Sequence, residues 1–228
     1  MEKTDSKKNR GLFLVIDGTD GSGKATQTKL LIERMGREGW PVETVSFPQY
    51  GQPSAGPVED YLAGKYGAAE TVGPKRASIL FAVDRYAASA KIRQWLGEGK
   101  IVVADRYVAS NMGHQGGKIA DPTEREAYFR WNDDLEYGVF QIPRPDLNLI
   151  LHVPCEITQG LLQERDGDRQ DIHQADADHL KNAEKTYIQM AEMFPEMSLI
   201  RCCKGRKILT REEIHEMVWE KVEILSKR

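Results

Sequence analysis

The chain has 228 residues, of which 40% are apolar and 29% are charged, a composition typical of a globular protein with one substantial core. The sequence contains no repeat and no low-complexity tract, which excludes a repeat architecture. The 32 basic and 35 acidic residues leave a net charge of −3, so nothing in the composition indicates nucleic acid or an anionic membrane as the main partner.

The first ten residues and the three cysteines give information about domain organisation and location. Residues 1–10, MEKTDSKKNR, are charged and lack an apolar signal core, so we predict a flexible N-terminal arm followed by a single domain over 11–228. The apolar run after the arm is too short to cross a membrane. Cys155, Cys202 and Cys203 form neither a disulfide framework nor a zinc-ligand spacing, which favours a reducing, cytoplasmic location.

Strands and helices are predicted to alternate along the chain. Short apolar runs rich in β-branched residues indicate strands at 12–16, 42–47, 101–104, 147–153 and 199–202. Periodic patterns and end signals indicate helices at 24–38, 58–63, 74–96, 122–137, 156–164, 176–193 and from 210 onward. This alternation predicts an α/β domain with a mostly parallel sheet that helices cover on both faces.

The stretch LFLVIDGTDGSGKATQTKLL, residues 12–31, joins a predicted strand, a glycine-rich turn and a helix. The glycines allow successive backbone N–H groups to point at phosphate oxygens, the helix adds its positive end, and Lys24 adds a mobile cation. The pattern favours a nucleotide-phosphate loop over a turn without a ligand. The predicted phosphate-binding residues are Gly18, Asp20, Gly21, Ser22, Gly23, Lys24, Ala25 and Thr26.

A second polar site is predicted at the end of the 101–104 strand, where Asp105 and Arg106 follow an apolar run. Ligands of parallel sheets bind beyond the carboxyl ends of the strands. A carboxylate in that position suits Mg²⁺, directly or through water, and an arginine suits phosphate. The alternative is a helix-capping Asp beside a surface Arg.

One position departs from the GxxxxGK[ST] pattern of phosphate loops. Ala25 stands where a hydroxyl group usually helps to hold magnesium, and Thr26 follows one residue later, so it points elsewhere on the helix. We therefore expect the ion to rely on phosphate oxygens, water and Asp105 or Thr26, with looser binding.

Several motifs resemble, in order, those of the thymidylate kinases, a family of nucleoside monophosphate kinases. GTDGSGKATQ resembles their phosphate loop, FPQYG their acceptor-side loop, LFAVDRY their base-binding helix, and DRYVASN followed by HQGG their central signature. IPRPDLNLILHV resembles the strand before their lid, and LLQERDGDRQDIHQAD resembles the lid, at about 164–176 here. The resemblance covers nearly the whole chain after residue 10 and becomes vague after Phe194.

The resemblance implies a P-loop three-layer sandwich with a mostly parallel, five-stranded sheet. It implies transfer of the γ-phosphoryl group of ATP to dTMP, giving dTDP and ADP for dTTP synthesis, with Mg²⁺ as cofactor. It also implies a homodimer packed through long helices, which the apolar faces of 74–96 and 122–137 would permit.

The resemblance assigns roles in dTMP binding, and each role suits its residue type. Asp20 would meet the 3′-hydroxyl, the ring of Phe81 would stack on thymine, and Arg106 would hold the acceptor phosphate. The alternatives are a core position for Phe81, a plain loop aromatic for Tyr50 and a solvated ion pair for Arg85. The implied dTMP-binding residues are Asp20, Phe47, Tyr50, Phe81, Arg85, Arg106, Ser110, Asn111, His114 and Gln115.

The charged segment before the helix at 176–193 reads either as a solvated connector or, by the resemblance, as the lid over ATP. The lid would supply a catalytic arginine, because the phosphate loop carries Gly21 and Ser22 and no arginine. Asp171 aligns with a lid acid, whereas Gln174 stands where an acid is often found. The implied catalytic residues are Lys24, Arg106, Arg165 and Arg169.

His114 is a second departure, because the family often has tyrosine there, close to the sugar 2′ position. Histidine is smaller and can hydrogen-bond, so we expect weaker discrimination against ribonucleotides.

Two other functions stay open. One is a kinase for a different nucleoside monophosphate or a deoxynucleoside, and the other is a binding module that uses ATP as a switch. An acceptor pocket with base-reading residues argues against the switch.

Overall fold

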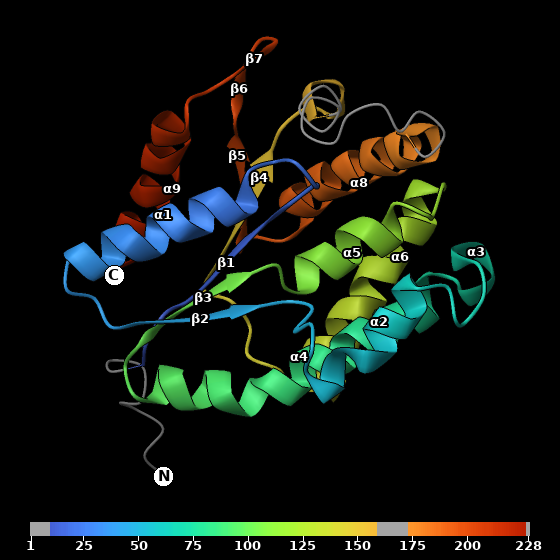
Figure 1. The fold of residues 1–228 in the computed structure, drawn as a ribbon, viewed down its shortest axis with the longest axis horizontal. Helices are drawn as coiled ribbons and strands as arrows, with labels where there is room; N and C mark the ends of the chain where they lie inside the picture. Colours follow the sequence, from blue (N-terminus) through green and yellow to red (C-terminus); the bar gives the residue numbers. More distant parts are fainter. Residues whose placement is uncertain (1–9, 159–172, 227–228) are drawn as a thin grey trace.

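The computed structural model describes residues 10–158 and 173–226. Five strands form one parallel sheet in the order β2-β3-β1-β4-β5 (Figure 1). Their bounds are β1 Phe13–Gly18, β2 Val42–Ser46, β3 Ile101–Asp105, β4 Leu147–His152 and β5 Met197–Arg201. The predicted α/β fold with a parallel, five-stranded sheet is confirmed.

Alternate residues of β1 enter two separate cores, one on each face of the sheet. Phe13 and Val15 pack with residues of α4 (Pro74–Gly97), α5 (Val108–Gly116), α6 (Pro122–Asp133) and α8 (His173–Met193). Leu14 and Ile16 pack with residues of α1 (Lys24–Arg37) and α9 (Arg211–Ser226), which cover the opposite face in Figure 1. Burial on both faces explains why this strand is continuously apolar.

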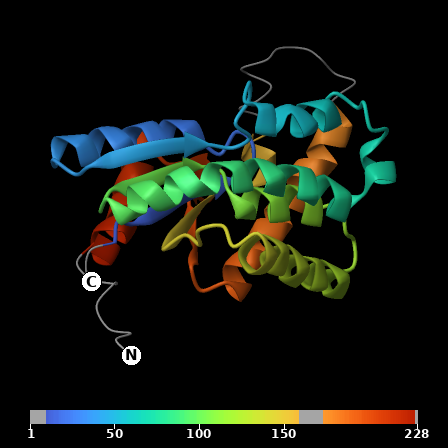
Figure 2. The same cartoon turned by 90° about the horizontal axis from the view of Figure 1, so that it is seen from below.

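The remaining elements are short. They are the 3-10 helix η1 (Pro53–Ala55), α2 (Gly56–Leu62), α3 (Ala69–Val72), the π-helix η2 (Asp134–Val139) and the antiparallel pair β6 (Cys203–Lys204) and β7 (Lys207–Ile208). Helices α2, α3, α5 and α6 gather beyond the carboxyl ends of the parallel strands (Figure 2). This is the end of the sheet where ligands of parallel α/β proteins bind.

Helix α5 was absent from the elements expected from the sequence, since glycines weaken the helical pattern of VASNMGHQG. The structure shows why two of these positions are glycine. A Cβ on Gly113 would lie 2.6 Å from the Tyr187 ring, and one on Gly116 would lie 2.8 Å from Phe129. Close packing against α8 and α6 therefore outweighs local helix propensity.

Other sequence expectations differ in detail. The helix expected at 122–137 ends as an α-helix at Asp133 and continues as the π-helix η2. The arm at 1–10, except Arg10, lies outside the described residues, as do most of the helix expected at 156–164 and most of the lid at 164–176. In the part of the chain that the structure describes, no helix is long and apolar enough to cross a membrane.

Candidate active site

The glycine-rich loop connects the buried strand β1 to α1. Gly18 has a φ of 138°, and a Cβ there would meet the carbonyl oxygen of Leu151 at 2.5 Å, so only glycine fits. Gly23 caps α1 in the left-handed conformation with a φ of 88°. The first turn of α1 contains no acidic residue, so its N–H groups and positive end stay suited to phosphate.

Lys24 is the buried cation of this loop. Its Nζ donates to the carbonyl oxygen of Thr19 at 2.7 Å and lies 3.7 Å from Oδ1 of Asp20. Burial, and then the charge of Arg106, lower the pKa of Lys24 to about 8. A bound polyphosphate would favour the charged amine and replace these internal partners.

Asp20 ties the loop to the end of β3, because its carboxylate accepts a hydrogen bond from Nη2 of Arg106. Burial alone would raise the pKa of Asp20, but the charges of Arg106 and Lys24 outweigh burial and hold it at about 2. The carboxylate is therefore ionised near neutral pH and holds Lys24 and Arg106 beside the phosphate loop.

Arg106 has an unusual backbone for a non-glycine residue, with a φ of 66°. Its Nη1 lies 3.3 Å from Oγ of Ser110 and 3.3 Å from Nε2 of His114. The guanidinium is thus held at the carboxyl end of the sheet by three side chains, in an orientation suited to an incoming phosphate.

Asp17 is an organising residue that sequence reasoning missed. Its Oδ1 accepts hydrogen bonds from Ser110 at 2.6 Å and Tyr187 at 2.8 Å, and its Oδ2 accepts one from the backbone N–H of Tyr107 at 3.2 Å. The available signal was an aspartate inside an apolar strand, which needs internal partners when it is buried.

Asp105 lies beside the loop, and its Oδ1 is buried without a hydrogen-bond partner among the described residues. Burial raises the pKa of Asp105, against the opposing charges of Arg106 and Lys24. An unpaired buried carboxylate oxygen next to a phosphate loop fits a divalent cation. The described residues contain no group of three or more His, Cys, Asp or Glu side chains that could hold a metal, so phosphates and water would complete the ion's coordination.

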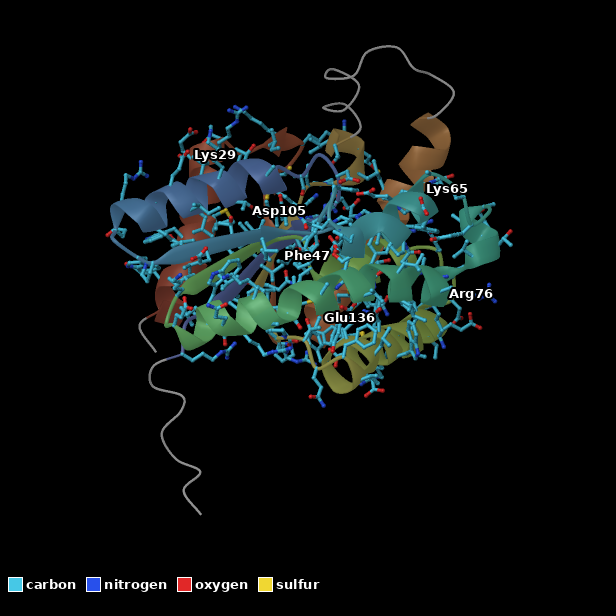
Figure 3. The ribbon with its side chains drawn as sticks, turned by 60° about the horizontal axis from the view of Figure 1, so that its bottom comes forward. Lys29, Phe47, Lys65, Arg76, Asp105 and Glu136 are labelled. Carbon is cyan, nitrogen blue, oxygen red and sulfur yellow. The ribbon has the colours of Figure 1, made fainter. Side chains whose placement is uncertain are left out.

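A cavity of about 780 Å³ opens next to the loop, and Asp105 and Phe47 mark its position near the centre of Figure 3. The cavity is lined by all the residues that the resemblance implied for dTMP binding, which come from the phosphate loop, the segment after β2, α4, the end of β3 and α5. The other lining residues include Tyr61, Lys118 and His179, which the sequence reasoning did not select.

The aromatic residues of the cavity differ in exposure. Phe47 is 3% exposed and packs in the core, whereas Tyr50 is 63% exposed at the rim. Phe81 is half-buried, and its ring meets that of Tyr61 edge to face with centroids 6.1 Å apart. Phe81 therefore offers a partly accessible face in the cavity, which suits stacking on a base.

Arg85 is 2% exposed, so the alternative of a solvated ion pair is wrong. Its Nε and Nη2 donate to the two carboxylate oxygens of Glu136 at 2.6 and 2.7 Å. Asn111 also lies in this network, with its Nδ2 3.3 Å from Oε1 of Glu136. Glu136 was not selected from the sequence, because a glutamate in a charged helix normally faces solvent.

His114 stacks on His179 of α8, with ring centroids 5.3 Å apart and Nδ1 to Nε2 at 3.1 Å. Burial, followed by the charge of Arg106, lowers the pKa of His114 to about 3. Because Arg106 can only donate, Nε2 of His114 accepts, which leaves the ring proton on Nδ1 facing His179. His114 thus connects the arginine at β3 to the helix that follows the expected lid.

The lid implied by the resemblance contributes four candidate residues. Arg165, Arg169 and Asp171 lie outside the described residues. Gln174 falls in the first turns of α8, but its side chain is also outside the description.

The glycine-rich loop and the adjoining polar cavity, at the carboxyl edge of a parallel sheet, define a P-loop phosphotransferase of the nucleotide kinase class. The family model described as thymidylate kinase matches residues 16–214, and the chain belongs to this family.

The matches to relatives with this name cover most of each relative's length. The chain is 29% identical over 185 residues to the thymidylate kinase of Mycobacterium tuberculosis, covering 79% of this chain and 86% of the relative. It is 29% identical over 208 residues to a probable thymidylate kinase of Pyrococcus abyssi, covering 91% and 93%. The solved structure of thymidylate kinase from Candida albicans matches with a TM-score of 0.71 at 20% identity, covering 94% of this chain and 92% of that one, which supports the fold.

Proposed function

We propose that this chain transfers the γ-phosphoryl group of ATP to dTMP, giving dTDP and ADP for dTTP synthesis. The observation that carries the proposal is the cavity beside the phosphate loop. It combines an aromatic face at Phe81, hydrogen-bonding groups at Arg85, Asn111 and Gln115, and a cation at Arg106 toward the loop. The names of the relatives support the same acceptor.

The reaction needs no general base, because the phosphate of dTMP is already an anionic nucleophile near neutral pH. Lys24 would bind the β and γ phosphates of ATP, and Arg106 would hold the acceptor phosphate for in-line attack. Asp20, which pairs with both cations in the structure, would then be released toward the sugar 3′-hydroxyl. Catalysis would come from alignment and cancellation of charge. Arg165 and Arg169 would add charge from the lid.

Magnesium is part of this proposal. When bound, the ion would neutralise charge on the transferring phosphates. Asp105 is the best candidate to hold it, directly or through water, because Oδ1 is buried without a partner among the described residues. The oxygens of Asp17 are engaged with Ser110, Tyr107 and Tyr187, so Asp17 is less suited to the role.

We also propose a homodimer and a cytoplasmic location. Ile79, Val83 and Tyr86 lie on one stripe of α4 and are 40%, 39% and 54% exposed. An apolar stripe on a long helix is suited to packing against the same stripe of a second copy. The cytoplasmic location rests on the cysteine pattern alone.

The test is ADP release from ATP and magnesium with separate acceptors: dTMP, dUMP, UMP, dCMP, AMP and GMP, with deoxythymidine as a nucleoside control. We expect a clear preference for dTMP. Preference for another monophosphate would contradict the roles assigned to the base-reading residues, but the assigned phosphate chemistry would still hold. Binding of ATP without transfer to any acceptor would favour the switch.

A further inference from the structure

Two buried amide side chains line the cavity, and charged neighbours orient them so that one offers its oxygen and the other its nitrogen. Asn111 is 3% exposed and Gln115 is 4% exposed, and both lie on α5 and line the cavity. A side-chain amide can present either an oxygen or a nitrogen to a ligand, so its partners on the protein side decide which end the ligand meets.

Three acceptors surround the nitrogen of Asn111. Nδ2 lies 3.2 Å from the carbonyl oxygen of Ser78, 3.1 Å from Oδ1 of Asn132 and 3.3 Å from Oε1 of Glu136, so these acceptors share its two N–H groups. Rotating the amide would bring its oxygen against three other oxygens. Oδ1 is buried and has no partner among the described residues, so it remains as an acceptor for a ligand.

Glu136 is the centre of this network. It is fully buried, lies in the π-helix η2, and appears between α4 and α6 in Figure 3. Its oxygens accept from Nε and Nη2 of Arg85, and Oε1 also accepts from Nδ2 of Asn132 at 3.2 Å. Nη1 of Arg85 makes no hydrogen bond with the described residues and remains as a donor in a residue that lines the cavity.

The orientation of Gln115 is set by Lys118, three residues later in the chain. Nζ of Lys118 donates to Oε1 of Gln115 at 2.9 Å and to the hydroxyl oxygen of Tyr61 at 2.8 Å. Rotating this amide would place its NH₂ group against an ammonium group, with two donors facing each other. Nε2 of Gln115 therefore stays available as a donor.

We propose that Glu136 and Lys118 are positioning residues that fix the hydrogen-bond polarity of the acceptor-base site, so that Asn111 offers an oxygen and Arg85 and Gln115 offer N–H groups. One acceptor and two donors complement the imide edge of thymine or uracil, which has one N–H and two carbonyl oxygens. Cytosine has an unprotonated ring nitrogen and an amino group on that edge, which mismatch the acceptor and one of the donors. This inference rests on the proposed function and names the residues that set its base preference.

The test uses two substitutions with matched controls. Lys118→Met keeps an unbranched side chain of similar length and removes the ammonium group. Lys91→Met is its control, because Lys91 also donates to a glutamine three residues away, Gln94, on the exposed side of α4. Glu136→Gln keeps the shape and removes one acceptor; Glu126→Gln is its control, because Glu126 pairs with Arg130 on the surface of α6. For each variant, kcat and KM are measured with dTMP and with dCMP at saturating ATP. The KM for ATP is measured as a check on the other substrate site.

In Lys118→Met, Gln115 can turn and offer its oxygen to the amino group of cytosine. We expect the ratio of kcat/KM for dTMP to that for dCMP to fall about tenfold. In Glu136→Gln, Arg85 loses one of its two hydrogen bonds, and we expect the KM for dTMP to rise about tenfold with a smaller change in kcat. The KM for ATP and both controls should stay unchanged, which a general loss of structure would not allow.

If Glu136→Gln fails to fold, Asn132→Ala replaces it, since it removes one partner of Asn111 and keeps the pair of Arg85 and Glu136. The expected result is a lower ratio of kcat/KM for dTMP to that for dCMP, as for Lys118→Met. Folded variants whose ratio and KM for dTMP stay within about twofold of their controls would overturn the inference while the proposed function stands. A wild-type chain that does not prefer dTMP to dCMP would overturn the proposed function and this inference with it.

Discussion

The hydroxyl group of Tyr187 on α8 donates a hydrogen bond of 2.8 Å to Oδ1 of Asp17 on β1, a residue 170 positions earlier in the chain. The same carboxylate oxygen accepts from Ser110, which contacts Arg106. The position of α8 is thus linked, through one buried carboxylate, to the arginine proposed to hold the acceptor phosphate.

Gly113→Ala should disturb this link, because the added Cβ would lie 2.6 Å from the Tyr187 ring. We expect the free energy of unfolding to fall by about 1–3 kcal/mol and the KM for dTMP to rise. Chemical denaturation and steady-state kinetics measure both effects. Gly36→Ala on α1 is the control, since a Cβ there meets nothing within 4 Å and should leave the stability unchanged or raise it. Equal stability of the two variants would contradict the expectation.

Lys24 should make ATP capture depend on pH, because its pKa is lowered to about 8 by burial and by Arg106. In the free enzyme the amine is charged below that pH and neutral above it, so kcat/KM for ATP should fall as the pH rises past about 8. At saturating ATP, kcat should fall less, since bound phosphates favour the charged amine. Lys24→Ala should lower kcat by about a hundredfold or more in a folded protein. A near-normal kcat in Lys24→Ala would show that Lys24 has no role in catalysis.

Ala25→Thr should strengthen magnesium binding, since it restores the hydroxyl group at the start of α1 that Ala25 lacks. We expect a lower magnesium concentration for half-maximal rate, measured at fixed ATP over a magnesium titration. Ala25→Val has a similar shape without the hydroxyl and serves as the control. An unchanged requirement in Ala25→Thr would show that the ion does not approach this position.

His114→Tyr should sharpen discrimination between dUMP and UMP, because a larger ring in the cavity leaves less room for a 2′-hydroxyl group. The wild-type histidine is held by Arg106 and His179, so the substitution also removes two contacts. Comparing kcat/KM for both acceptors separates the effects, since loss of the contacts should weaken dUMP and UMP alike. An unchanged ratio would mean that His114 does not face the sugar.

Val83→Asp should weaken the proposed dimer, because it places a charge in the middle of the exposed stripe on α4. Sedimentation equilibrium should give a dimer for the wild type and a monomer, or a much weaker dimer, for the variant. Ile224→Asp is the control, because Ile224 is 57% exposed on α9 and lies outside the stripe. A wild-type monomer, or equal association of all three proteins, would contradict the proposal.

The sequence by itself determined the parts of this protein that depend on neighbouring residues. The phosphate loop is one contiguous stretch whose glycines, Lys24 and flanking strand and helix can be read together. The alternation of apolar strands with amphipathic helices was sufficient for the parallel sheet, because each pattern follows from burial of one face or of both. The motifs of the resemblance were likewise contiguous, and their residues lie around one cavity.

Only the tertiary structure decided how the buried polar groups pair. Arg85 and Glu136 are 51 positions apart, and Asn111 and Glu136 are 25 apart, so no local pattern indicates that they meet. Helix α5 likewise forms despite its glycines, because close packing against Tyr187 and Phe129 compensates for weak propensity. A buried charge is stable only beside its partners, and which partners reach it depends on how the helices pack around the sheet.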